Sequence, residues 1–420
     1  FIPALTVKFI GAIALGLIYE YYYNGGDTFN YYHHAKLIHV AFDSSIQAGL
    51  KLIMTSGGEY DPETAPFTTY MFWYQAGSAE YLISRFAAVL GFLCFNTYMV
   101  IALMFAAISF TGIWAMYITF VKIRPQMYKE LAIACFFVPS VFFWGSGLMK
   151  DSLCLGALGW LFYAFYKGAI QKRSLLTSAL TGVGVAYMLV LIKVYILLCF
   201  LPAALLWVFN ENSARIKNGA LRIIAKPFLL SIGAALAFYA ATNLTKGDEH
   251  YDIDKIGERS KIVSEYLYET GVKQNGSAYS LGEQDGTLTG MVKLVPQAIV
   301  VSLYRPFLWE VRNPVMLLSS LEALVFLVFT LRIIIRSGLF KTLSLIIRTP
   351  ALTLCFIFAL TFSGTVGVVS ANFGTLVRYK IPMIPFYVAG LYITQSMSVP
   401  RRQAARVAKA QGGNGRLVPA

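Results

Sequence analysis

Residues 97–121 read TYMVIALMFAAISFTGIWAMYITFV, and the basic segment KIRPQMYK follows at 122–129. The first stretch has no charged residue and exceeds the ~20 residues that an α-helix needs to cross a bilayer. Similar runs recur along the chain, which is 57% hydrophobic and only 13% charged, whereas a soluble domain carries about 25% charged residues. Because a helix satisfies its own backbone in lipid, the pattern predicts an all-α polytopic membrane protein.

Ten membrane spans are expected, and they form a single transmembrane domain over residues 1–400. The segment 152–167 is short, and Lys193 divides a long apolar run into two short halves. Such segments predict tilted or broken helices that line a cavity. The ten segments are 4–23, 97–121, 130–148, 152–167, 175–192, 195–210, 227–244, 314–333, 350–369 and 381–398.

Lys and Arg are unevenly distributed among the connections. Five connections hold 18 of the 35 Lys and Arg residues, and only Glu130 and Glu211 lie on or beside them. By the positive-inside rule these connections and both termini are cytoplasmic, and the loops 24–96 and 245–313 lie on the outer side. The tail 401–420 is expected to be disordered. The five connections are 122–129, 167–173, 210–226, 332–348 and 401–409.

The outer loop 24–96 has apolar residues at helical spacing over 35–53 and 79–95. This spacing predicts amphipathic helices that lie on the outer leaflet. The net charge of +14 follows the pattern of membrane topology, so it indicates contact with membrane lipids and not with nucleic acid.

The first span is followed by GGDTFNYYHH at 25–34, which places Asp27 where the chain leaves the bilayer. An ionised group beside hydrocarbon is costly and is therefore a functional candidate. We interpret Asp27 as a general base over a membrane cavity, with Tyr31 and His34 shaping a polar pocket around it. The alternative is an exposed turn, for which Gly-Gly-Asp is favourable.

A second candidate is FFWGSGLMKDSL at 142–153, which lies between two apolar segments with almost no loop. Lys150 and Asp151 therefore stand at the outer edge of a helical hairpin. Asp151 is the second candidate catalytic acid, Lys150 a candidate ligand of phosphate, and Trp144 a wall of the binding site. The alternative is a capped hairpin with a local ion pair.

Further cations stand at the outer ends of later spans. Lys193 falls where the chain turns, Arg305 precedes the eighth span, and Arg378 and Lys380 open the last one. Together with Lys150, these cations are predicted to bind the phosphate or pyrophosphate of a donor. The alternatives are snorkelling of Lys193 to the headgroups and ordinary stop-transfer charge at the last span.

The segment SLYRPFLWEVRNP, residues 302–314, combines aromatic rings with an acid and a guanidinium. Rings pack against the apolar face of a sugar, and carboxylates accept hydrogen bonds from its hydroxyls. Tyr304, Trp309 and Glu310 are therefore predicted to bind the sugar or the acceptor. An aromatic belt at the membrane interface is the alternative.

All these groups are expected on the side that has no access to cytoplasmic ATP. An enzyme there needs an activated substrate that the membrane delivers. A polyprenyl-phosphate-linked or polyprenyl-pyrophosphate-linked sugar fits, because cations can hold the lipid phosphate while a carboxylate activates a hydroxyl of a glycan or glycoconjugate acceptor. The cysteines and histidines show no metal spacing, so no cofactor is predicted, and a divalent cation stays as an alternative.

These residues resemble the C-type (GT-C) superfold of integral-membrane glycosyltransferases. GGDTFNYY matches the position of the catalytic acid after the first span, 33–95 matches the helices of the first outer loop, and RYKIPMIPFY is similar to an Arg-aromatic-x-x-Pro-x-x-Pro pattern. The resemblance implies Asp27 as the catalytic acid. The acidic pair usual in that superfold is absent, since Thr28 follows Asp27.

The sequence thus predicts a glycosyltransferase of the bacterial inner membrane whose active site faces outward and serves synthesis of cell-envelope glycans. One alternative is an O-antigen or exopolysaccharide polymerase or ligase, in which Arg305, Arg378 and Lys380 matter more than Asp27. Another is a flippase or transporter of lipid-linked oligosaccharides, which predicts polar residues at mid-bilayer and inverted repeats.

Overall fold

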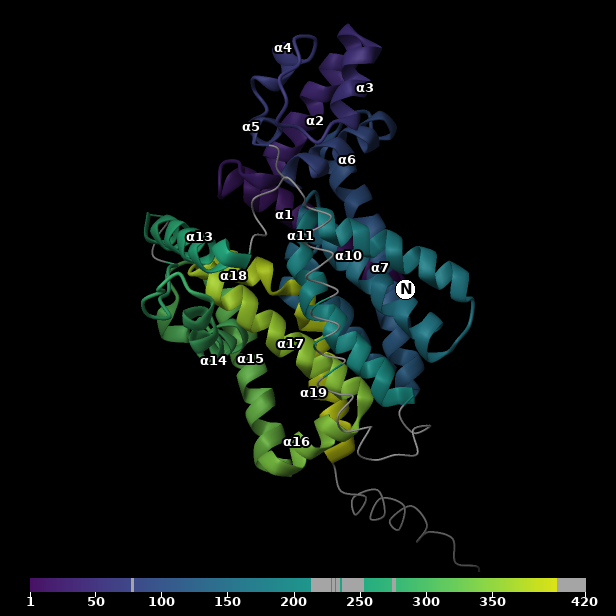
Figure 1. Ribbon diagram of the computed structural model, residues 1–420, viewed down its shortest axis with the longest axis vertical. Coiled ribbons are helices and arrows are strands. Elements are labelled where there is room, and N and C mark those ends of the chain that lie inside the picture. The colour runs from purple at the N-terminus through teal and green to yellow at the C-terminus, as the bar shows by residue number, and fades with distance from the viewer. Residues whose placement is uncertain are drawn as a thin grey trace, which may run out of the picture.

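The computed structural model is a bundle of helices from which a smaller group of helices projects (Figure 1). It describes residues 1–76, 79–212, 228, 231, 235, 253–273 and 277–398. Within these residues the only β-pairing is an isolated bridge between Ala278 and Asn372. Six of the described helices are long and apolar enough to cross a membrane, which confirms the all-α membrane class.

Four predicted spans coincide with continuous helices, namely α1 (Ile2–Tyr21), α7 (Tyr98–Ile123), α15 (Pro314–Ser337) and α17 (Pro350–Ser370). The other two long helices are α10 (Lys150–Phe165) and α11 (Leu175–Asn212). The first continues into a π-helical turn, η3 (Tyr166–Ile170). The predicted segments 175–192 and 195–210 are the two halves of α11. Its backbone leaves helical geometry at Lys193, with φ −150° and ψ 75°.

Two other predicted spans are broken. Residues 130–148 form α8 (Tyr128–Ala132), the π-turn η2 (Ile133–Phe137) and α9 (Pro139–Trp144). Pro139 has no N–H and forces Val138 into an extended conformation, so the helix must restart there. Residues 381–398 form η7 (Ile381–Met383) and α19 (Ile384–Ser398). The segment 227–244 lies almost wholly outside the described residues, so the total of ten spans stays a prediction.

The centre of the bundle depends on small residues in α7 and α10. A Cβ atom on Gly112 of α7 would collide with the backbone oxygen of Gly156 in α10, and a Cβ on Gly159 would collide with that of Gly112. Close contact between helix backbones is the usual way in which membrane helices associate. The start of α10 is thereby held at a fixed depth beside α7.

The segment 27–93 forms the projecting group at the top of Figure 1. It consists of α2 (Asp27–Ser44), α3 (Ile46–Met54), the short α4 (Ala65–Thr68) and α5 (Phe72–Gln75), and α6 (Ala79–Leu93). The helices predicted to lie on the outer leaflet bury their apolar residues against one another, for example Ile38, Leu52 and Ile83. We call this group the outer bundle.

The second outer segment contains α13 (Ile253–Lys273) and α14 (Leu288–Tyr304), which packs along α17. The turn η6 (Leu308–Glu310) leads into α15, and the amphipathic α16 (Leu339–Arg348) joins α15 to α17. The short α18 (Phe373–Tyr379) follows α17 and lies beside α13 (Figure 1).

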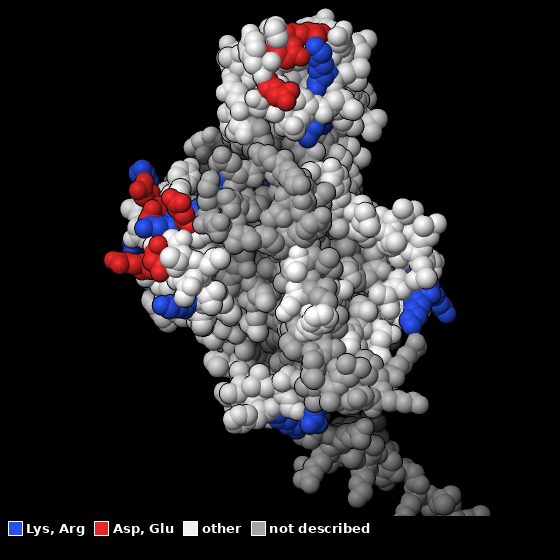
Figure 2. Space-filling view, viewed as in Figure 1, with Lys and Arg blue, Asp and Glu red and all other residues white. Residues whose placement is uncertain are grey.

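Charge is distributed unevenly over the face shown in Figure 2. Acidic and basic side chains lie together on the outer bundle and around α13, whereas the patches near α16 and near the connection from η3 to α11 are basic. This is the pattern expected for a chain whose outer segments carry the acids.

Candidate functional site

A cavity of about 740 Å³ lies where α1, α9, α13 and α18 meet the start of α2. Asp27 and Arg378 line it, and so do Trp144, Lys273 and Asn372. These residues come from elements far apart in the sequence. Three of them were predicted from the sequence as site residues, namely Asp27, Trp144 and Arg378.

The local backbone explains the position of Asp27. Gly25 and Gly26 have φ values of 119° and 117°, which allow a sharp turn after α1. A side chain on Gly26 would also press against the ring of Tyr19. Asp27 then starts α2, where a carboxylate is stabilised by the positive end of the helix dipole.

Arg378 lies at the end of α18 and joins the two candidate acids. Its Nη2 donates to Asp27 Oδ2 at 2.8 Å and to Asp151 Oδ2 at 3.5 Å. Its Nη1 donates to the hydroxyl of Tyr19 at 3.1 Å, and its guanidinium lies 5.8 Å from the ring centre of Trp144. Asp27 has no acidic neighbour in the sequence, but the fold brings Asp27 and Asp151 to one guanidinium.

Asp151 lies in the first turn of α10 and forms an ion pair with Lys193 at the bend of α11. Lys150, its neighbour, forms an ion pair with Glu80 of the outer bundle. Three carboxylates and three cations thus form a connected set without net charge, which we call the charge network. Its members are Asp27, Glu80, Lys150, Asp151, Lys193 and Arg378.

Exposure changes along the charge network. The side chain of Asp27 is 39% exposed, that of Arg378 16%, and those of Asp151 and Lys193 only 3% and 5%. Asp27 is therefore the acid that a ligand in the cavity can reach. The buried pair of Asp151 and Lys193 fixes the guanidinium of Arg378 on the side away from the cavity.

Several buried polar atoms near the cavity have no partner within the protein, although Ser152 and Tyr31 do not line the cavity itself. They are Arg378 Nε, the hydroxyl of Ser152 and the hydroxyl of Tyr31. Burial raises the pKa of Tyr31, and the nearby carboxylates of Asp27 and Glu80 raise it further. Buried polar groups nearly always have partners, so these atoms point to a ligand or ordered water.

His34 belongs to the interior of the outer bundle and does not line the cavity. Its side chain is buried beside Phe72 and Trp73, and neither ring nitrogen has a partner. Burial, with a smaller contribution from His33, lowers its pKa to about 4. His34 is therefore a neutral side chain at pH 7.

The segment 304–310 lies behind the cavity wall. Arg305 forms an ion pair with Glu310, which also accepts from the backbone N–H of Phe307 at 2.7 Å. Burial alone would raise the pKa of Glu310, but these hydrogen bonds outweigh it and lower the pKa. The guanidinium of Arg305 lies 5.3 Å from the ring centre of Phe373, which does line the cavity.

Two aromatic candidates point elsewhere. The hydroxyl of Tyr304 is 3.0 Å from that of Tyr387 in α19. Trp309 is 81% exposed and stacks on Phe307. Neither of them lines the cavity.

Lys380 points away from Arg378, because residues two apart on a helical turn face in different directions. It is buried and donates to the backbone oxygen of Ser302 at 3.1 Å. The buried Glu322 of α15 lies near it and accepts from the N–H and hydroxyl of Ser140 at 2.9 and 2.8 Å. Lys380 therefore faces the interior of the bundle.

Sequence reasoning missed Tyr19, Glu80 and Lys273. Tyr19 is an aromatic residue at the outer end of a span, where an interfacial belt is the ordinary explanation. Glu80 lies in the first turn of α6, and its partner Lys150 is 70 residues away in the chain, so the local sequence does not reveal the pair. Nothing in the local sequence of Lys273 distinguishes it from other lysines of the outer loop.

Comparison with protein-family models, with curated proteins and with solved structures finds no match for this chain. Among the described residues, no three His, Cys, Asp or Glu side chains come together as a metal site.

Proposed function

We propose that this chain is a membrane glycosyltransferase that takes a sugar from a polyprenyl-phosphate-linked donor at the outer side of the membrane. The observation that carries the proposal is the contact between Asp27 and Arg378 at 2.8 Å in the wall of a polar cavity. A carboxylate that reaches the cavity stands beside a cation with an unpartnered N–H. Transfer from a phosphate leaving group needs these two kinds of group.

In this proposal Asp27 is the general base. It accepts the proton of an acceptor hydroxyl while the hydroxyl oxygen bonds to the anomeric carbon of the donor sugar. The bond from that carbon to the phosphate oxygen breaks, and the lipid phosphate leaves with the electron pair. The guanidinium of Arg378, which lines the cavity, stabilises the developing charge on this phosphate.

The rest of the charge network positions Arg378. Asp151 accepts from the same guanidinium and is itself held by Lys193, so the guanidinium cannot turn away from the cavity. The network has no net charge, so an incoming phosphate needs another cation. Lys273 lines the cavity, is 79% exposed and has only a 3.9 Å surface contact with Glu269, so it is the cation that completes phosphate binding.

The alternative of a polymerase or ligase is supported less well by this geometry. That mechanism needs several cations around one pyrophosphate. In the described part of the chain, Arg305 forms an ion pair with Glu310, and Lys380 donates a hydrogen bond to the backbone oxygen of Ser302. Neither cation lines the cavity.

The test uses full-length protein in proteoliposomes with radiolabelled hexoses on polyprenyl phosphate and oligosaccharides on polyprenyl pyrophosphate. We expect loss of sugar from the monophosphate donor. Arg378→Ala should raise the donor concentration required, because a lost charge-assisted hydrogen bond costs about 10- to 150-fold. Arg312→Ala, an exposed arginine outside the cavity, is the matched control. Use of the pyrophosphate-linked oligosaccharides alone would replace this proposal with the polymerase.

A further inference from the structure

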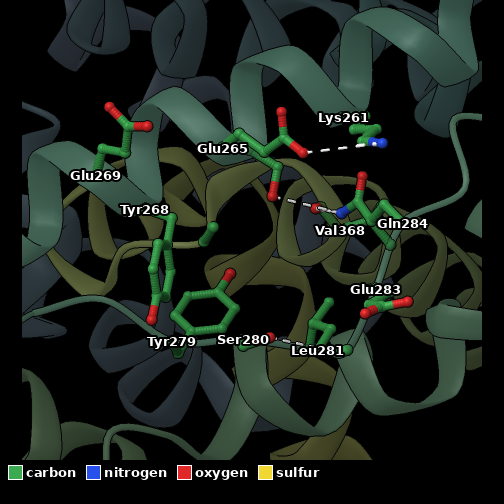
Figure 3. Close-up of a pocket in the computed structure, with 13 residues that line it drawn as sticks. Lys261, Glu265, Tyr268, Glu269, Tyr279, Ser280, Leu281, Glu283, Gln284 and Val368 are labelled. Carbon is green, nitrogen blue, oxygen red and sulfur yellow. Dashed lines mark hydrogen bonds and ion pairs between the residues drawn. The ribbon is translucent and has the colours of Figure 1, made fainter.

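A second cavity of about 410 Å³ lies on the other side of α13 (Figure 3). One wall is formed by residues of α13 that recur with helical spacing, including Glu265, Tyr268 and Glu269. The opposite wall is the segment 279–284, and Val368 and Ala371 at the end of α17 contribute to the lining. We call it the α13 pocket.

The α13 pocket and the main cavity share one partition. Tyr266 and Thr270 of α13 line the main cavity, while Glu265 and Glu269 line the α13 pocket. The partition is rigid at its base, because Phe373 N–H donates to Ser277 O at 2.8 Å and Tyr279 N–H donates to Ala371 O at 3.0 Å. The two cavities thus lie on opposite sides of one helix, and a ligand that passes over α13 reaches both.

The charges of the α13 pocket differ from those of the main cavity. Glu265, Glu269 and Glu283 line it, and Lys261 is the only cation among the lining residues. Lys261 is 3.9 Å from Glu265, and the side chain of Glu265 is 63% exposed. Negative potential in this pocket repels phosphate, so the pocket does not suit the donor head group.

The polar groups of the α13 pocket suit hydroxyls. Gln284 donates through its amide NH₂ to Val368 O at 3.0 Å, which fixes the orientation of the amide because a carbonyl can only accept. Its Oε1 has no partner and needs a donor. The partly exposed ring of Tyr268 stands on the same wall as the carboxylates of Glu265 and Glu269 (Figure 3). An aromatic face beside several acceptors is the arrangement that binds a sugar ring.

We infer that the α13 pocket binds a sugar residue of an uncharged or amine-bearing glycan, as an acceptor-side subsite of the proposed transferase. The inference rests on the proposed function for its place in the reaction. The pocket would hold an inner sugar of the acceptor while the terminal hydroxyl reaches Asp27 in the main cavity. It deepens the proposal by stating the class of acceptor, since an anionic glycan is excluded by the carboxylates.

The test is binding of glycans to the full-length protein in nanodiscs. Arrays of neutral, amine-bearing and acidic oligosaccharides are screened first. The best binder is then titrated in competition with a lysine-rich peptide, the other kind of ligand that an acidic pocket attracts. We expect a neutral or amine-bearing glycan to bind. Tyr268→Ala should weaken this binding about tenfold through loss of stacking. Glu265→Gln should weaken it about 3- to 10-fold through weaker hydrogen bonds.

Matched controls are Glu258→Gln, on the same helix outside the pocket, and Tyr70→Ala on the outer bundle, both of which should bind like the wild type. Glycan binding that Tyr268→Ala leaves unchanged, binding of acidic glycans only, or preference for the peptide would each overturn the subsite. If one of these results is found while donor turnover in proteoliposomes still depends on Arg378, only the subsite is wrong. If glycan binding depends on Tyr268 but no lipid-linked donor is used, the pocket stands and the transferase proposal fails.

Discussion

Asp27 is the residue on which the proposed chemistry depends most directly. Asp27→Asn keeps the size of the side chain and can still accept from Arg378, but it cannot take a proton. Loss of a general base should slow turnover about 10²- to 10⁴-fold, with donor binding nearly intact, in the proteoliposome assay. Asp61→Asn, which alters a surface ion pair with Lys51, is the control. A wild-type rate for Asp27→Asn would make this acid a turn residue only.

His34 should make the outer bundle sensitive to acid. Its pKa is about 4 in the folded chain and 6.5 when exposed, so only the unfolded state takes up a proton between these values. Stability is therefore full above pH 6.5 and falls by up to about 3 kcal/mol as the pH drops toward 4. Melting curves across this range should show a decline that His34→Phe reduces and that the exposed His33→Gln retains. Equal slopes of melting temperature against pH for His34→Phe and the wild type would contradict this prediction.

The sequence identified single residues better than their partners. Asp27, Asp151, Lys193 and Arg378 stood out because ionised groups beside hydrocarbon are costly. Their pairing could not be predicted, since Arg378 is 351 residues from Asp27 in the chain. Lys380 lies two residues after Arg378, so the two side chains face different directions. Which of them faces the cavity becomes known only when α18 is placed in the fold.

At the scale of elements, the bend of α11 depends on the buried pair of Lys193 and Asp151. Lys193→Leu leaves Asp151 short of a partner inside the bundle, which should destabilise the protein by about 3–5 kcal/mol. Adding Asp151→Leu removes the uncompensated charge and should restore most of the stability. Thermal unfolding in detergent measures both variants. A double variant no more stable than Lys193→Leu would show that the bend does not depend on this pair.

A surface pair serves as the control for this experiment. Lys51 is 41% exposed and pairs with Asp61 and Glu63 on the outer bundle. Lys51→Leu should change stability far less than Lys193→Leu, because water screens exposed charges.

The lengths of the apolar runs predicted the helices well where no proline interrupts a run. The long runs became α1, α7, α15 and α17. The break at Pro139 follows from the missing N–H of proline, which run length does not register. The packing of 35–53 and 79–95 into the outer bundle follows from contacts between elements, which the spacing of apolar residues does not contain. α6 has an apolar face, as predicted, but that face packs on α2.

At the scale of the whole molecule, the distribution of charge predicts that the outer bundle and α16 lie on opposite sides of the membrane. Tyr60 and Phe340 are 83% and 87% exposed, and all five native cysteines are buried. Tyr60→Cys should react with a membrane-impermeant maleimide on intact cells, and Phe340→Cys only after permeabilisation. The reverse pattern would place the cavity on the side that has ATP.

The spacing of the charge network along the chain also bears on how the protein is made. Lys193 lies 42 residues after Asp151, so both charges leave the ribosome within one helical hairpin. The translocon can accept these two charges as a neutral pair, with neither ion left alone in lipid. Arg378 emerges 227 residues after Asp151. A chain released before Arg378 is made would therefore insert with both acids in place and the cation that joins them missing.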